Sequence, residues 1–123
     1  VRSRRTATAA PAAPSTPSPF ELARSELRAL PAPDDEDDDA RLYYYTALCA
    51  ILRRFASGHH GILAEVRTSE ELLAVTSHGA EPLRGCLSAC DLVKFAASRP
   101  SAAAHEQARE QAARYLSAVE EGR

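Results

Sequence analysis

The sequence predicts an all-α fold, a small bundle of about five helices behind a disordered N-terminal linker. Apolar residues recur at three- and four-residue spacing, helix-capping signatures precede these runs, and the alternation typical of strands is nearly absent. A chain of 123 residues has room for one domain. We therefore divide it into a linker, residues 1–17, and a helical domain, residues 18–121.

The linker consists of Ala, Pro, Ser and Thr behind a basic cluster, and Val1 is its single large apolar residue. Such a segment buries too little apolar surface to offset chain entropy, so we expect it to be disordered. Because the sequence begins without a methionine, we expect a longer protein upstream. Arg2, Arg4 and Arg5 fit either an ordinary basic linker or the cytoplasmic flank of a preceding transmembrane helix.

The first helix is predicted to begin after Ser18, which caps it. Pro19 occupies a first-turn position, where a missing N–H costs nothing, and Glu21 can close a capping box. Pro31 and Pro33 then end the helix. Its apolar face consists of Phe20, Ala23, Leu27 and Leu30.

The longest helix is predicted over residues 40–57, with Gly58 as its C-terminal cap. The acidic run DDEDDD at residues 34–39 precedes it, where the helix dipole favours negative charge. This run lacks the ligand alternation and mid-loop glycine of a helix-loop-helix calcium site, so we interpret it as a solvated charge run. The predicted apolar face of the helix consists of Leu42, Tyr45, Leu48, Leu52 and Phe55, widened by Tyr44 and Ile51.

Residues 59–67 are predicted to form an extended connector that packs on the bundle through Ile62, Leu63 and Val66. Residues 68–71, TSEE, form a second capping box, which opens a short helix ending near Gly79.

A fourth helix is predicted from about Pro82 to Ala97, ended by Arg99-Pro100, and Ser101 caps a fifth. The fourth presents Leu83, Cys86, Leu87, Cys90 and either Val93 or Lys94 on one side. The fifth carries a narrow stripe rich in small residues, which allows close approach of a partner helix: Ala104, Ala108, Ala112, Tyr115 and Val119.

Cys86 and Cys90 lie one helical turn apart, so their thiols face the same way. Together with Cys49 or with His59, His60 or His78 they suggest a metal- or redox-responsive domain as one hypothesis. The other is core packing, since both lie on an apolar face and free cysteine packs as a small hydrophobe. Three cysteines without CxxC spacing indicate neither a disulfide framework nor a zinc ribbon.

Nothing in the sequence resembles a glycine-rich phosphate loop, a GxSxG nucleophile or a cysteine–histidine catalytic pair. We therefore predict a protein that is not an enzyme and that has no catalytic, cofactor-binding or metal-binding residues. Its basic residues outside the linker are scattered among acids, so binding of nucleic acid is not predicted.

Two features favour an interaction surface. Tyr43, Tyr44 and Tyr45 point in three directions around one helix, which leaves at least one aromatic side chain near the surface, and aromatic residues are enriched in protein interfaces. The alternative for the tyrosines is packing of all three in the core or at its edge. Lys94 is the only lysine in the chain. It is spaced for a helix ion pair with Asp91, but such a pair is worth only about 0.2–0.5 kcal/mol and does not explain this distinctive cluster.

Three stretches carry a family resemblance: FELARSELRAL, LYYYTALCAILRRFASGHHGILAEVRTSEELLAV and ACDLVKFAASRPSAAAHEQAREQAARYLSAVEE. In this order they resemble the C-terminal cytoplasmic region of BatD-like membrane proteins of bacterial aerotolerance-type operons and their short single-spanning relatives. The resemblance covers about residues 18–121. The chain departs from the family pattern in its histidines before the glycine turn, its very acidic run and its short segment between Val75 and Cys86. These departures affect the expected structure of local loops more than the resemblance itself.

The resemblance implies a domain at the cytoplasmic side of the bacterial inner membrane, joined to it only through an upstream segment. It implies a non-enzymatic role beside a MoxR-type AAA+ ATPase or a von Willebrand factor A-domain protein, in envelope stress or chaperone-like assembly. It supplies no catalytic residues, and it favours the membrane-proximal interpretation of the three linker arginines. The alternatives are the metal- or redox-responsive domain and a purely structural oligomerisation domain that uses the small-residue stripe.

For a partner-docking surface, the sequence points to residues with charged or aromatic side chains in the blocks that carry the resemblance. These candidates are Tyr43, Arg53, Arg54, Asp91, Lys94 and Arg99.

Overall fold

The computed structural model describes residues 17–34, 36–61 and 68–122. Within these ranges the chain forms five helices and no strand, which confirms the predicted all-α bundle. The predicted disorder of residues 1–16 lies outside the described residues, as does the predicted packing of residues 62–67. The helices are α2 (Pro19–Ala29), α3 (Asp38–His60), α4 (Ser69–Ala74), α5 (Ala80–Ala96) and α6 (Ala102–Gly122).

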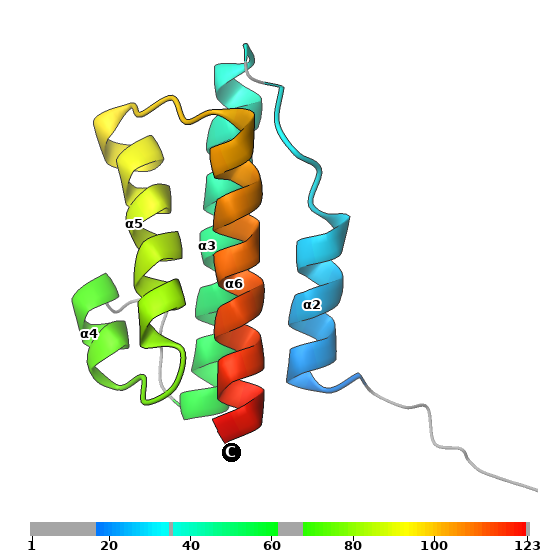
Figure 1. Ribbon diagram of the computed structural model, residues 1–123, viewed down its shortest axis with the longest axis vertical. Coiled ribbons are helices and arrows are strands. Elements are labelled where there is room, and N and C mark those ends of the chain that lie inside the picture. Colours follow the sequence, from blue (N-terminus) through cyan, green and yellow to red (C-terminus); the bar gives the residue numbers. More distant parts are fainter. Residues whose placement is uncertain (1–16, 35, 62–67, 123) are drawn as a thin grey trace, which may run out of the picture.

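The four longer helices alternate in direction and form an antiparallel bundle (Figure 1). Helices α3 and α6 run in one direction, and α2 and α5 run in the other. Helix α5 packs on both α3 and α6, α2 packs on the same two helices, and α4 packs on α5. The start of α2 and the end of α6 lie at one end of the bundle, whereas the start of α3 and the end of α5 lie at the other (Figure 1).

The predicted capping signatures are present. Ser18 and Glu21 form the capping box of α2, and Thr68 and Glu71 form that of α4. Each box satisfies backbone N–H groups that a helix start otherwise leaves without partners. The Ser101 hydroxyl accepts a hydrogen bond from the Ala104 N–H at the start of α6, as predicted.

The apolar faces meet in one core. Every large side chain buried there adds about 1.5–3 kcal/mol of hydrophobic stabilisation relative to an exposed one. The largest fully buried side chains from α3, α4, α5 and α6 are Tyr44, Tyr45, Leu48, Leu52, Leu72, Leu83, Cys86, Leu87, Cys90, His105, Tyr115 and Leu116.

A buried polar cluster joins the start of α6 to α3. The Tyr44 hydroxyl donates a hydrogen bond to the His105 backbone carbonyl at 2.8 Å, and the Tyr45 hydroxyl lies 2.8 Å from His105 Nδ1. All three side chains are fully buried. The periodicity assigned Ala104 to the inward face and did not predict a buried histidine beside it.

Helix α3 is longer than predicted at both ends. Asp37 is the N-terminal cap, accepting a hydrogen bond from the Ala40 N–H, and the helix ends at His60. Gly58 is therefore not the C-terminal cap; Gly61 is, in a left-handed conformation with φ 68°. The predicted extended conformation of His59 and His60 is wrong as well.

Ring packing accounts for the extra turn of α3. The His59 ring stacks on the Phe55 ring one turn earlier, with centroids 5.5 Å apart, and also contacts Phe20 of α2 at 6.1 Å. These contacts are formed only if the helix continues past Gly58.

Helix α5 begins at Ala80, two residues before the predicted start, and α4 ends at Ala74, before the predicted end near Gly79. The turn between them depends on Gly79, whose φ is 78°. A Cβ atom added there would lie 3.1 Å from Ala118 Cβ and from the Tyr115 ring, so glycine is required by conformation and by space.

We predict that Gly58→Ala and Gly61→Ala have opposite effects on the free energy of unfolding, measured by urea denaturation. Gly58→Ala should stabilise by up to about 1 kcal/mol, since it replaces a glycine inside a helix where nothing lies within 4 Å of the new Cβ. Gly61→Ala should destabilise by about 1–2 kcal/mol because of its left-handed conformation. Destabilisation by Gly58→Ala without destabilisation by Gly61→Ala would mean that α3 ends at Gly58, as the sequence predicted.

Candidate functional site

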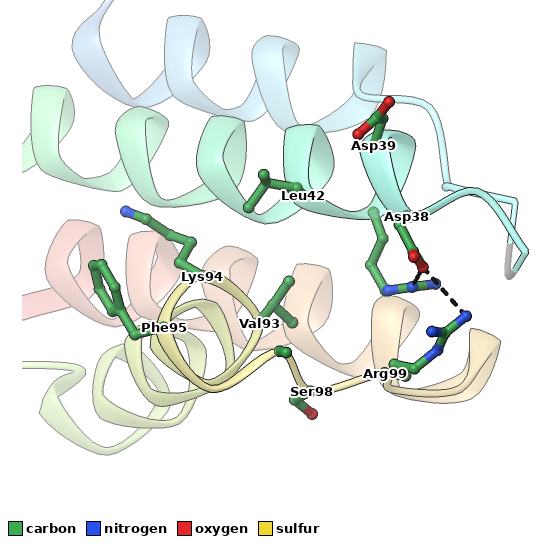
Figure 2. Close-up of a pocket in the computed structure, with 10 residues that line it drawn as sticks. Asp38, Asp39, Leu42, Val93, Lys94, Phe95, Ser98 and Arg99 are labelled. Carbon is green, nitrogen blue, oxygen red and sulfur yellow. Dashed lines mark hydrogen bonds and ion pairs between the residues drawn. The ribbon is translucent and has the colours of Figure 1, made fainter.

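A groove lies where the end of α5 meets the start of α3 (Figure 2). Its volume is about 350 Å³. We call it the α3–α5 groove, and its lining residues are Asp38, Asp39, Arg41 and Leu42 from α3, and Val93, Lys94, Phe95, Ala97, Ser98 and Arg99 from the end of α5 and the following turn.

The apolar part of the groove is largely open to solvent. Phe95 is 78% exposed and Leu42 45% exposed, whereas Val93 beneath them is buried. The prediction that Leu42 belongs to the core is wrong. Tyr44, Tyr45 and Leu48 fill the inward face of α3, and Leu42 is left at its edge, facing the groove.

Asp38 holds two arginines at one end of the groove. It forms ion pairs with Arg41 and with Arg99, the latter at 3.2 Å (Figure 2). The Arg41 side chain is buried, and a buried cation depends on its carboxylate partner much more than an exposed one does. Arg99 and Asp38 are exposed, so their own pair contributes at most about 1 kcal/mol.

Lys94 has a different environment. Its Nζ lies 5.4 Å from the centre of the Phe95 ring, a cation–π contact. In residues 17–34, 36–61 and 68–122 no carboxylate pairs with it, so the predicted Asp91–Lys94 ion pair is not formed.

The turn after α5 positions Arg99. Ala97 ends the helix in a left-handed conformation, with φ 53°, and the Ser98 N–H bonds back to the Leu92 carbonyl at 3.0 Å. For an alanine this conformation costs roughly 1–2 kcal/mol. The bend directs the chain across the bundle end to α6 and leaves Ser98 and Arg99 lining the groove.

The groove contains two of the six predicted interaction residues, and the other four lie outside it. Lys94 and Arg99 meet in the groove, and Tyr43, the neighbour of Leu42 in sequence, is 63% exposed. Asp91 is half-buried on α5 and does not line the groove. Figure 2 shows Lys94 and Phe95 at one end of the groove and Asp38 and Arg99 at the other.

Arg53 and Arg54 lie far along α3 and join helices. Arg53 donates hydrogen bonds to the Ser69 hydroxyl of α4 at 3.1 Å and to Cys49 Sγ at 3.3 Å. Arg54 pairs with Glu26 of α2 at 2.8 Å. The structure therefore gives these two arginines packing roles outside the groove.

Three residues important to the groove were not predicted as site residues: Arg41, Leu42 and Phe95. For Arg41 a signal exists, because Asp38 precedes it by three residues and such pairs meet on a helix. For Phe95 a signal also exists, because it lies off the apolar face predicted for its helix. For Leu42 the sequence offered none, since a periodic pattern does not distinguish the edge of an apolar face from its centre.

The three thiols lie together in the core. Cys49, Cys86 and Cys90 are free and buried. The hydrogen bond between Cys49 and Cys90, together with burial, raises the pKa of the Cys49 thiol. At Cys90 the hydrogen bond to Cys49 lowers the pKa, but the hydrogen bond to Cys86 and burial outweigh it and raise the pKa. Thiols with raised pKa are poor nucleophiles and poor metal ligands.

A second cavity, of about 220 Å³, is lined by His59, His60 and His78 at the end of the bundle opposite the groove. Burial, and secondarily the nearby His59, lower the pKa of His60. Across the described part of the chain, no group of three or more His, Cys, Asp or Glu side chains is arranged to hold a metal ion.

Comparison of the chain with protein-family models, with curated proteins and with solved structures gave no match.

We predict that the thiols of the folded protein react slowly with a disulfide reagent such as Ellman's reagent, at least about 100-fold more slowly than those of the urea-unfolded chain. Burial excludes the reagent from all three thiols, and the raised pKa of Cys49 and Cys90 suppresses the thiolate there, so reaction must wait for unfolding. The absorbance of the coloured thiolate that the reagent releases measures the rate of reaction. If the folded protein rapidly released one or more equivalents of this thiolate per chain, that result would support a redox-responsive role instead.

We also predict that the free energy of unfolding falls as the pH rises from about 8 to about 10.5. In the unfolded chain the thiols of Cys49 and Cys90 and the phenols of Tyr44, Tyr45 and Tyr115 lose their protons near the ordinary pKa values of about 8.5 and about 10. In the folded chain these five groups retain their protons to higher pH. Burial raises the pKa of Tyr44 and Tyr45, and that of Tyr115 to about 12. The stabilisation is complete below the unfolded pKa and is lost as the pH rises towards the folded one. Urea denaturation at both pH values checks this.

Proposed function

We propose that the chain is a non-enzymatic protein-interaction domain that docks a partner through the α3–α5 groove. One observation carries the proposal: Phe95 is 78% exposed beside a groove, although the sequence supplies a folded core without it. Aromatic residues, Phe among them, are enriched in protein interfaces relative to the rest of the surface.

The surroundings of Phe95 support this proposal. Leu42 adds a second exposed apolar surface in the same groove, and Lys94 and Arg99 add cations at its margins. Apolar contact surrounded by charged groups is the usual anatomy of an interface. Covering the two apolar side chains would contribute roughly 25 cal/mol for each Å² of apolar area removed from water.

Leu42 and the groove residues contributed by α5 and the following turn fall in the blocks that carry the BatD-like resemblance, whereas Asp38, Asp39 and Arg41 lie just before the block that begins at Leu42. From that resemblance we infer a partner of the MoxR-type AAA+ ATPase or von Willebrand factor A-domain class, and a place at the cytoplasmic face of the bacterial inner membrane. Any membrane attachment would come from an upstream segment. In the described part of the chain, no helix is both long enough and apolar enough to cross a membrane.

The oligomerisation alternative relied on the small-residue stripe of α6. Ala108 and Ala112 of that stripe are buried inside the bundle, and Gln111 beside them packs over Gly85 of α5. The close approach that small residues allow is therefore used within one chain. The groove is the better candidate for contact with another molecule.

We predict that Phe95→Ala weakens capture of the partner in co-expression pull-downs by at least about 10-fold, as loss of an interface anchor does. Leu42→Ala should weaken it by a smaller factor. Leu22→Ala is the matched control, since Leu22 is 50% exposed on α2, away from the groove.

Two results would oppose this proposal. One is co-purification of a MoxR-type ATPase or A-domain protein that is equally strong with Phe95→Ala and with the unaltered domain. The other is the absence of any association when both candidate partners are co-expressed with the domain. Thermal unfolding of each variant verifies that a loss of binding is not a loss of folding.

A further inference from the structure

We infer that the occupant of the α3–α5 groove is a peptide segment with a fixed order of charge: an acidic residue at one end, large apolar residues in the middle and a basic residue at the other end. This inference rests on the proposed function and names the chemistry of the partner at the same site.

The end of the groove at Lys94 and Phe95 favours an anion. Lys94 is half-buried and contacts the Phe95 ring, and no described carboxylate pairs with it. A carboxylate placed beside Lys94 would therefore gain a charge-assisted hydrogen bond without breaking an existing ion pair. Because Phe95 is adjacent, the same segment can place an apolar side chain on the ring.

The opposite end of the groove carries more acidic than basic side chains and favours a cation, although Arg41 and Arg99 also lie there. Asp38 is already shared by Arg41 and Arg99, but Asp39 forms no ion pair with any described residue. Asp34, Glu36 and Asp37 are exposed just before it in sequence and add to the negative charge there. Figure 2 shows Lys94 and Asp39 at opposite ends of the groove, with Leu42 between them.

The size of the groove indicates side chains of a docking segment. A volume of about 350 Å³ lies at the lower limit of ligand pockets and is far too small for a folded element. Electrostatic complementarity of this kind sets the register and orientation of a segment more than its affinity. The unpaired charges of opposite sign therefore select a direction along the groove.

A selection from a displayed library of random 12-residue peptides tests the inference. We use the folded domain as bait, and in parallel a variant in which Lys94→Glu and Asp39→Lys exchange the two charges without altering net charge. The unaltered domain should enrich peptides that carry an acidic residue on one side of an apolar middle and a basic residue on the other. A spin label at the acidic end of an enriched peptide should broaden the NMR signals of residues near Phe95 in the unaltered domain. In the exchanged variant the same label should broaden those near Arg99, because the peptide then binds in the reverse orientation.

Each outcome separates the inference from the proposed function. If peptides bind through Phe95, lost with Phe95→Ala and retained with Leu22→Ala, but lack the two opposite charges or keep their orientation on the exchanged variant, this inference is wrong and the proposed function stands. If no peptide is enriched while the partner protein is still captured through Phe95, this inference alone is wrong. If Phe95→Ala leaves both peptide binding and partner capture unchanged, both are wrong. If light scattering shows a dimer that Phe95→Ala dissociates, the occupant is a second copy of the chain, and the peptide segment is overturned.

Discussion

The hydrogen-bonded cluster of Tyr44, Tyr45 and His105 is the constraint on which the rest of the bundle depends. It fixes the first turn of α6 against α3 with two buried hydrogen bonds, and any of these polar groups left unpaired would cost about 1–3 kcal/mol. Only residues 97–101 connect α5 to α6, so anchoring α6 also holds the end of α5 beside the start of α3. The two walls of the α3–α5 groove are thereby held in a defined relation.

Charge is arranged differently at the two ends of the bundle. At the groove, a buried arginine and an exposed one share Asp38, while Lys94 and Asp39 have no ion-pair partner in the part of the chain that the structure describes. At the far end, arginines link helices: Arg54 to Glu26 and Arg24 to Glu120. Salt would screen the exposed groove charges strongly, so association there should weaken as ionic strength rises.

Local signals in the sequence predicted most of the fold. The capping boxes at Ser18 and Thr68 depend on residues three apart and appear as expected. The end of α3 was misplaced because Gly58 and Gly61 are equivalent in sequence, and only the stacking of His59 on Phe55 distinguishes them. For the site, Lys94 and Arg99 were predicted from their chemistry. Phe95 was not, although it lies off the apolar face predicted for its helix, and Leu42 was not because its exposure depends on how α3 and α5 meet.

The groove lies far from the residues at which the described chain begins its first helix and ends its last. Pro19 and Gly122 lie at the end opposite the groove, and α3 alone, with 23 residues, spans about 35 Å (Figure 1). A tether, fusion tag or surface attached near either residue is thus kept a full helix length from the docking position. The bundle acts as a rigid spacer that holds its binding end outward, and immobilising the domain through either end would leave the groove open to a partner in solution.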